Sequence, residues 1–342
     1  MNCALNLSVS KALELVKYAA LGLDMDVIHG FISNNGLSEA FLQQAVYWFD
    51  PLVEKLIEHQ IGAKRTFVVG INGCQGSGKT TLAEYLCLRL KARELKVAAI
   101  SIDDFYLTHT QRQQLALAVH PLLATRGVPG SHDLELALET LQQLSTTSGA
   151  VKIPKFNKAQ DDRLPKEQWP VESETPLDII ILEGWCVGIS AETEDALLKP
   201  VNELESLQDP NGKWRRYVNQ QLENDYPALW QLIDCLIMLQ VPSFSCVYQW
   251  RLEQEQKIKP ASVNHRIMNA EQIKQFIQHY ERLTQHSLKT LPLTCQYLFK
   301  LSENRSIVGY QEPQTFSKGS VFDTPKNESP LKDLLLRGPN ND

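Results

Sequence analysis

An eight-residue stretch of glycine, lysine and hydroxyl residues offers the first recognisable chemistry in this sequence. Residues 73–80 read GCQGSGKT and fit the pattern G-x-x-x-x-G-K-[ST] at every required position. Such a turn points backbone N–H groups at phosphate oxygens, and the helix that follows adds a partial positive charge. Lys79 would reach the β- and γ-phosphates of ATP. We expect ATP to contact Gly73, Cys74, Gln75, Gly76, Ser77, Gly78, Lys79, Thr80 and Thr81.

Carboxylates follow two apolar runs further along the chain. Asp103 and Asp104 come after residues 97–102, and Glu183 comes after residues 178–182. Open α/β sheets assemble their sites at the carboxyl ends of the strands. Asp103 is therefore a candidate to orient an acceptor hydroxyl and take its proton, and Glu183 is a candidate Walker-B-like acid. Paired aspartates after a strand are also common helix caps, which is the alternative for Asp103. The expected Mg²⁺ ligands are Thr80, Asp103 and Glu183.

Short β-branched runs alternate with helical stretches over most of the chain. The runs that predict strands are 66–71, 97–102, 179–182, 236–241 and 297–301, and residues 134–144 carry a helical spacing of apolar residues. This alternation favours a parallel sheet covered by helices on both faces. With the glycine-rich loop, it predicts the three-layer α/β sandwich of P-loop NTPases with a mainly parallel central sheet.

The chain divides into three expected parts. Residues 1–62 form a helical extension without visible chemistry, and residues 63–311 form the domain that carries the motifs. Within that domain, residues 149–176 are an expected substrate insert, because their prolines and charges show no sustained period. A lid is expected near 245–290. Residues 312–342 have four prolines and few aromatic residues, and are expected to be a flexible tail.

Composition excludes several functional classes. The 342 residues are 43% hydrophobic and carry a net charge of −6, which argues against nucleic acid as a partner. The apolar runs are much shorter than the about 18 residues of a membrane span, and no signal peptide is recognisable, so we expect no membrane partner and a cytoplasmic location. The seven cysteines contain no C-x-x-C pair and are expected to be reduced thiols. Nothing in the sequence indicates an oligomeric state.

Taken together, the motifs resemble the P-loop small-molecule kinases that include uridine kinase, phosphoribulokinase and pantothenate kinase. Three further strings are similar to the D-glycerate 3-kinase branch: RGVPGSHD at 126–133, IPKFNK at 153–158 and WRLEQE at 250–255. The resemblance spans residues 65–310. It implies transfer of the γ-phosphate of ATP, with Mg²⁺, to the 3-hydroxyl of D-glycerate, which yields 3-phosphoglycerate.

A small anion such as glycerate requires positively charged side chains, such as a bidentate arginine, for its carboxylate and polar partners for its hydroxyl groups. The expected substrate-binding residues are Asp104, Tyr106, Arg126, His132, Asp133, Lys155 and Arg163. Helix capping is the alternative role for His132 and Asp133. By similarity to these kinases, Arg251 lies on a lid helix and closes on the phosphates as a catalytic residue; the alternative is a solvated arginine.

The substrate loop departs from the pattern of the branch. That loop usually reads Tyr-Asp-Lys-Ser and continues into Gly-Arg-Gly-Asp-Arg, whereas here residues 156–159 read FNKA and residues 160–163 read QDDR. A phenol and a carboxylate are lost, so the substrate stays open. The alternatives are a kinase for a nucleoside, pantothenate or a sugar phosphate, and a nucleotide-dependent switch or chaperone without catalysis.

Cys74 lies inside the phosphate-binding loop. A thiol beside a helix N-terminus can have a lowered pKa, and its oxidation would then block ATP. The alternative is an inert small residue that fills a loop position.

Overall fold

The computed structural model describes residues 25–257 and 268–312. Parts of three predictions lie outside these residues: the helical pattern before residue 25, the segment 258–267 of the expected lid, and the tail from residue 313 onward. Within the described ranges, no helix is both long and apolar enough to cross a membrane.

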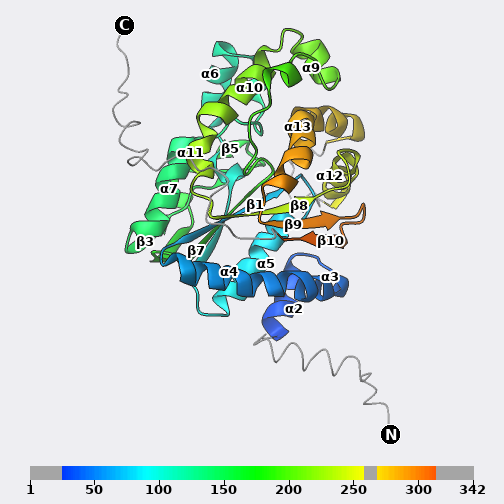
Figure 1. Cartoon of the computed structure of the whole chain (residues 1–342). Coiled ribbons are helices and arrows are strands. Elements are labelled where there is room, and N and C mark those ends of the chain that lie inside the picture. The colour runs from blue at the N-terminus through cyan, green and yellow to red at the C-terminus, as the bar shows by residue number, and fades with distance from the viewer. Residues whose placement is uncertain (1–24, 258–267, 313–342) are drawn as a thin grey trace.

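A six-stranded sheet forms the centre of the protein (Figure 1), in the order β10-β9-β8-β1-β7-β2. Its strands are β1 (Phe67–Gly73), β2 (Val97–Ser101), β7 (Ile179–Gly184), β8 (Cys235–Gln240), β9 (Tyr297–Leu301) and β10 (Ile307–Gln311). All neighbours pair in parallel except β9 and β10, which are antiparallel. The mainly parallel sheet confirms the predicted fold, while β10 was not predicted.

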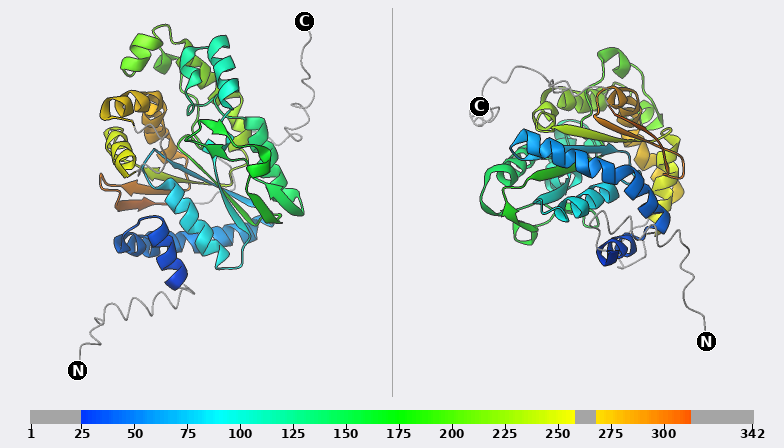
Figure 2. Two further views of the ribbon diagram at one scale, coloured as in Figure 1. Left: turned by 180° about the vertical axis from the view of Figure 1, so that it is seen from behind. Right: turned by 60° about the horizontal axis from the view of Figure 1, so that its bottom comes forward.

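Alternation along the strands divides the core between the two faces of the sheet. On β7, Ile179 and Ile181 belong to one buried cluster, and Ile180 and Leu182 belong to the other. Each face is therefore apolar and must be covered by helices. The result is the predicted three-layer arrangement (Figure 2).

Different helices cover each face. The first cluster includes α2 (Met25–Asn34), α3 (Glu39–Gln44), α4 (Asp50–Ala63), α5 (Lys79–Lys91) and α12 (Ser245–Lys257). The second includes α7 (Leu134–Thr146), α10 (Lys213–Asn224) and α11 (Tyr226–Trp230). The long helix α13 (Ala270–Thr290) contributes to both. Helix α9 (Glu203–Gln208) adds Leu204 to the second cluster, and the two other helices are α6 (His109–Ala118) and α8 (Glu194–Leu197).

A buried polar contact fastens the N-terminal helices to the helix that follows the phosphate loop. Asp50 of α4 accepts hydrogen bonds of 2.8 Å from Tyr85 and from Arg89 of α5, and all three side chains are buried. Removing one partner of an ion pair that is buried in this way leaves an unpaired charge in the core and strongly destabilises the fold. The contact therefore fixes α4 against α5.

The expected substrate insert contains two small antiparallel pairs. Strand β3 (Gly149–Lys152) pairs with β6 (Val171–Thr175), and β4 (Phe156–Asn157) pairs with β5 (Asp162–Arg163). Asn157 Oδ1 accepts hydrogen bonds from the backbone of Ala159 and Gln160, which shapes the turn between β4 and β5. This turn is what carries Lys158 toward the end of β2.

Candidate active site

Strand register brings the three predicted motifs to one edge of the sheet. Glu183 on β7 pairs with Ile71 on β1 and with Ser101 on β2. The phosphate loop begins two residues after Ile71, and Asp103 lies two residues after Ser101. All three therefore leave the sheet at the same level, as parallel strands require.

Glycine conformation shapes the phosphate loop. Gly76 and Gly78 have φ angles of +81° and +89°, which L side chains rarely adopt. Gly78 directly precedes α5, so Lys79 and Thr80 occupy its first turn and Thr81 follows, half-buried. The side-chain oxygens of Gln75 and Ser77 are buried without a hydrogen-bond partner. The Ser77 hydroxyl and the backbone N–H groups at this helix N-terminus can donate to an anionic ligand, whereas the amide oxygen of Gln75 can only accept a hydrogen bond.

Glu183 lies against the first turn of α5. Its Oε1 accepts a 3.0 Å hydrogen bond from the Thr80 hydroxyl, and its Oε2 is 3.8 Å from Lys79 Nζ, an ion pair too long for a hydrogen bond. Glu183 is only 4% exposed, and Oε2 has no hydrogen-bond partner. A buried carboxylate oxygen and a hydroxyl are suitable ligands for Mg²⁺, which prefers few carboxylates together with phosphates and water.

Asp103 accepts a hydrogen bond on each carboxylate oxygen. Oδ1 is 2.8 Å from the hydroxyl of Tyr106, and Oδ2 is 2.6 Å from Lys158 Nζ. Burial alone would raise the pKa of Asp103, but the ammonium groups of Lys158 and Lys79 outweigh it and hold the pKa well below its usual range. Asp103 is therefore an ionised carboxylate that lies within the field of the phosphate-loop lysine.

Asp104 points into the insert. Its Oδ2 is 2.9 Å from Lys155 Nζ, and its Oδ1 accepts a 3.2 Å hydrogen bond from the backbone N–H of Phe156. Burial raises the pKa of Asp104, and Lys155 counters this only in part. The pair anchors strand β4 beside the end of β2.

Tyr106 and His132 stack on each other behind Asp103. Their ring centroids are 4.6 Å apart, and both residues are buried. His132 Nδ1 is hydrogen-bonded to the hydroxyl of Tyr226, and burial lowers the pKa of His132 to about 4. His132 is thus a neutral, packed side chain that supports Tyr106.

Asp133 and Arg163 form another acid–cation pair. Asp133 is the N-cap of α7 and accepts a hydrogen bond from Leu136 N, as the capping alternative predicts. Its other oxygen lies 3.0 Å from Arg163, which also donates to the carbonyl of Tyr106 at 2.9 Å. Arg163 therefore joins β5 to the segment after β2.

Arg126 was expected to be open to a substrate carboxylate, but it is already paired. Its guanidinium is hydrogen-bonded to Asp161 and lies 3.4 Å from the carbonyl of Lys158. Asp161 also pairs with the buried Arg112 at 3.0 Å. Asp161 belongs to residues 160–163, where this sequence departs from the pattern of the kinase branch. One of the altered residues therefore pairs with an arginine that was expected to bind the substrate carboxylate.

Arg251 lies on α12 and pairs with Glu255 one turn further on at 2.7 Å. The same helix contacts the phosphate loop, because a Cβ atom added at Gly76 would lie 2.6 Å from Trp250 Cβ. The middle of the predicted lid helix thus packs beside the loop that the lid was expected to cover.

Comparison with known proteins assigns the family. No protein-family model matches the sequence. An uncharacterized kinase of Schizosaccharomyces pombe is 34% identical over 229 residues, which cover 63% of this chain and 79% of that protein. The chain belongs to the D-glycerate 3-kinase-like family of P-loop kinases.

The names of two further relatives state a substrate. A chloroplastic D-glycerate 3-kinase of Arabidopsis thaliana is 36% identical over 62% of this chain, a match that spans 46% of that protein. The structure of a D-glycerate 3-kinase from Cryptococcus neoformans has a TM-score of 0.61 and 28% identity, and the match covers 76% of this chain and 99% of that one.

Three residues of this kinase lie at the site without having been predicted. Lys158 binds Asp103, Tyr280 donates a 3.3 Å hydrogen bond to the carbonyl of Arg126, and Arg305 donates one of 2.9 Å to the carbonyl of Gly76. Lys158 belongs to the string IPKFNK and could have been included. Tyr280 and Arg305 lie 154 and 229 residues from their partners, so these two contacts depend on the tertiary fold.

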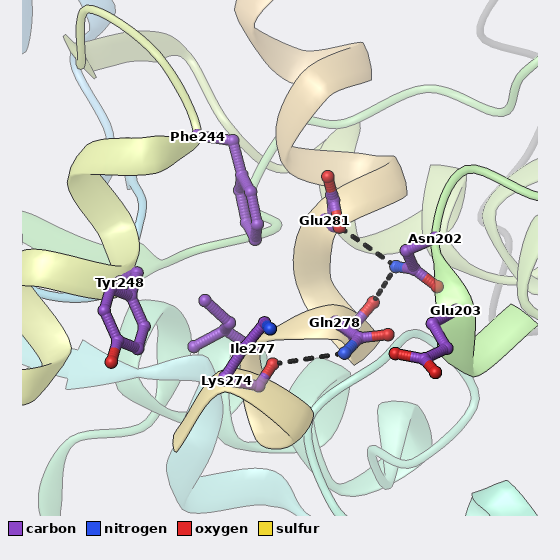
Figure 3. A pocket seen from close by; sticks show the side chains of 8 residues that line it. All are labelled: Asn202, Glu203, Phe244, Tyr248, Lys274, Ile277, Gln278 and Glu281. Atoms are coloured by element: carbon purple, nitrogen blue, oxygen red, sulfur yellow. Dashed lines mark hydrogen bonds between the residues drawn. The ribbon is translucent and has the colours of Figure 1, made fainter. Parts of the chain in front are cut away.

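A cavity of ≈ 460 Å³ lies between α9, α12 and α13 of the kinase (Figure 3). Phe244, which directly precedes α12, and Tyr248 on α12 project into it opposite Ile277 of α13. On its polar side, Asn202 donates hydrogen bonds to the carbonyl of Gln278 and to Glu281. None of the predicted site residues lines this cavity, so it is separate from the phosphate loop.

Proposed function

We propose that the protein transfers the γ-phosphate of ATP to the 3-hydroxyl of D-glycerate, which yields 3-phosphoglycerate and ADP. The observation that carries the proposal is the position of Asp103. This carboxylate lies at the end of β2, within the field of Lys79, and faces an insert whose basic side chains gather around it. The names of the relatives in Arabidopsis and Cryptococcus supply the substrate.

Each residue has a part in the proposed reaction. Lys79 and the loop N–H groups bind the phosphates, and Asp103 orients the acceptor hydroxyl and takes its proton. Thr80 and Glu183 would hold Mg²⁺, which when bound neutralises charge on the phosphates. Asp103 was also expected to be a ligand, but its two oxygens are hydrogen-bonded to Tyr106 and Lys158, so we assign it only the proton-acceptor role. We assign Arg251 of α12 to the transferring group, because the preceding residue Trp250 packs on the phosphate loop at Gly76.

Basic residues of the insert favour an anionic acceptor over a nucleoside. Lys155 and Lys158 have side chains that are 51% and 60% exposed, so both ammonium groups remain accessible from the site. A nucleoside site would instead require aromatic faces for stacking.

Residues 63–311 are proposed as the kinase domain, residues 1–62 as an added helical element and 312–342 as a tail. The cysteines of the described ranges are free thiols, which suits the cytoplasm as the proposed compartment.

The test is coupled ADP release with ATP and Mg²⁺ across D-glycerate, L-glycerate, pantothenate, uridine and ribulose 5-phosphate, with identification of the product. Turnover on D-glycerate that yields the 3-phosphate is expected. Asp103→Asn should lower kcat by about 100-fold or more, because the proton acceptor is lost. Turnover on another acceptor alone would replace the proposed substrate, and ATP binding without any turnover would favour a switch.

A further inference from the structure

The approach to Asp103 Oδ2 is occupied by a cation. Lys158 Nζ lies 2.6 Å from this oxygen, and the Tyr106 hydroxyl lies 2.8 Å from the other one. A proton from an acceptor hydroxyl must reach a carboxylate oxygen within hydrogen-bond distance. While the ammonium group neutralises the carboxylate and stands in front of Oδ2, Asp103 is a poor acceptor for that proton.

The two donors differ in their freedom to move. Tyr106 is 3% exposed, and its ring stacks on His132 and meets the edge of Phe156. The Lys158 side chain is 60% exposed and extends from the turn between β4 and β5, whose backbone is fixed by Asn157. Lys158 can therefore swing away without a shift of the backbone, whereas Tyr106 is held in place.

The other cations around the site pair with other carboxylates. Arg163 pairs with Asp133 and its side chain is 12% exposed, and Arg126 pairs with Asp161 and is 25% exposed. Lys155 is 51% exposed, nearly as much as Lys158, but it binds the buried Asp104. Lys158 is therefore the accessible cation that lies on Asp103, and an anionic acceptor that approaches Asp103 meets it there.

We propose that Lys158 couples the arrival of an anionic acceptor to the exposure of Asp103: the carboxylate of the acceptor draws the ammonium group away, and Asp103 then receives the hydroxyl proton. This inference rests on the proposed function. A neutral molecule such as water offers no charge to move Lys158, so hydrolysis of ATP is suppressed while no acceptor is bound.

The step balances without any further reactant. The acceptor oxygen forms a bond to the γ-phosphorus, and the bond between that phosphorus and the β,γ-bridging oxygen breaks. The electron pair leaves with ADP, and the hydroxyl proton passes to Asp103 Oδ2. Lys158 acts as a positioning residue, because it controls access to the group that takes the proton.

The test compares Lys158→Met, which removes the charge, with Lys158→Arg, which keeps it. Lys152→Met is the matched control, because Lys152 is an exposed lysine of the same insert that donates to the carbonyl of Lys166 instead. ADP release is measured without acceptor, with D-glycerate and with glycerol, its analogue that lacks the carboxylate. KM values for ATP and for the acceptor are determined separately.

Lys158→Met should increase ADP release without acceptor by about threefold or more, because Asp103 becomes open to water. Its KM for D-glycerate should rise by roughly 10- to 100-fold, the range of one lost hydrogen bond to a charged group. The KM for ATP should stay within about twofold of the wild-type value. Turnover with glycerol should increase together with acceptor-free ADP release, because this uncharged acceptor cannot draw Lys158 away from Asp103 in the wild type. Lys158→Arg should recover most of the D-glycerate KM, and Lys152→Met should behave as the wild type.

Several outcomes would overturn the inference. Acceptor-free ADP release that is unchanged or lower in Lys158→Met shows that the lysine does not block Asp103. A rise in the KM for ATP alone shows that Lys158 serves the γ-phosphate, and an unchanged D-glycerate KM excludes the coupling. If the wild type does not phosphorylate D-glycerate but Lys158→Met still increases ADP release, the proposed substrate is wrong and the blocking of Asp103 stands.

Discussion

Arg305 donates a hydrogen bond of 2.9 Å to the carbonyl oxygen of Gly76 and thereby ties the segment after β9 to the phosphate loop. Its guanidinium also lies 4.9 Å from the ring centroid of Trp250 and 2.7 Å from Glu253, both on α12. One side chain thus connects the phosphate loop with α12 and with the segment after β9. Because arginine is planar and can stack and hydrogen-bond at once, lysine cannot replace it fully.

Arg305→Ala should raise the KM for ATP by about 10-fold, since the loss of a charge-assisted hydrogen bond leaves the Gly76 carbonyl and α12 less well held. The KM for the acceptor should stay within about twofold, because Arg305 does not contact the insert. Steady-state kinetics with each substrate varied in turn makes this measurement. The KM for ATP of Arg305→Lys should lie between the values of the wild type and Arg305→Ala. An ATP KM equal to that of the wild type would show that the loop keeps its shape without Arg305.

Gly76→Ala and Gly78→Ala form a matched pair of substitutions in the phosphate loop. Both glycines have positive φ, so each alanine should cost about 1–2 kcal/mol of backbone strain. A Cβ at Gly76 would also lie 2.6 Å from Trp250 Cβ, whereas one at Gly78 meets nothing within 4 Å in the described part of the chain. Gly76→Ala should therefore be the less stable variant and bind ATP more weakly.

Thermal unfolding and calorimetric titration with a non-hydrolysable ATP analogue compare the two variants under identical conditions. Equal losses in both would mean that α12 can move away from the loop at little cost. That result would contradict the close packing of Trp250 on Gly76.

The parts of the site that could be predicted are those encoded by consecutive residues. The phosphate loop, Asp103 and Glu183 each follow an apolar run, and parallel pairing alone brings the ends of such runs together. The five predicted strands occur for the same reason, because a strand buried on both faces appears as a continuous apolar run. Strand β10 was missed because it lies at the edge of the sheet and has only half-buried or exposed residues.

The pairing of charges could not be predicted. Arg126, Lys155 and Arg163 were each expected to bind the substrate, but each is paired with an aspartate that only the folded insert brings close. Composition gives the number of charged side chains but not which of them form ion pairs. Long-range contacts such as Arg305 with Gly76 depend on how α12 packs against the sheet, which no local pattern encodes.

The environment of Cys74 supports the inert alternative for this residue. The thiol is 6% exposed, and burial raises its pKa to about 12, although Lys79 acts in the opposite direction. Desolvation of the thiolate is the larger effect here, so the helix N-terminus does not activate this cysteine. Cys74 is a buried thiol and not a reactive one.

Mild peroxide or iodoacetamide at neutral pH should consequently leave ATP turnover unchanged, and mass spectrometry should find Cys74 unmodified while the native protein is intact. Cys74→Ser is the control, and it should keep an ATP KM close to that of the wild type. Rapid inactivation that Cys74→Ser prevents would contradict the buried position of the thiol.

His132 makes the stability of the protein depend on pH. The side chain is 5% exposed, its Nε2 has no hydrogen-bond partner, and burial lowers the pKa from 6.5 to about 4. The unfolded chain therefore binds a proton on this histidine at a higher pH than the folded protein does. Stability that is fully present above pH 6.5 is lost as the pH falls toward 4, by about 3 kcal/mol in total.

His132→Gln isolates this contribution, because glutamine does not titrate but keeps a group that can bond to Tyr226. At pH 7.5 the variant should be less stable than the wild type, since the stack on Tyr106 is weakened. The difference in melting temperature should shrink as the pH is lowered from 6.5 to 4.5, because only the wild type loses the His132 contribution. His279 and His286, whose pKa values burial also lowers, are present in both proteins and cancel in the comparison. A difference that stays constant over this range would show that His132 is as easily protonated in the folded protein as in the unfolded chain.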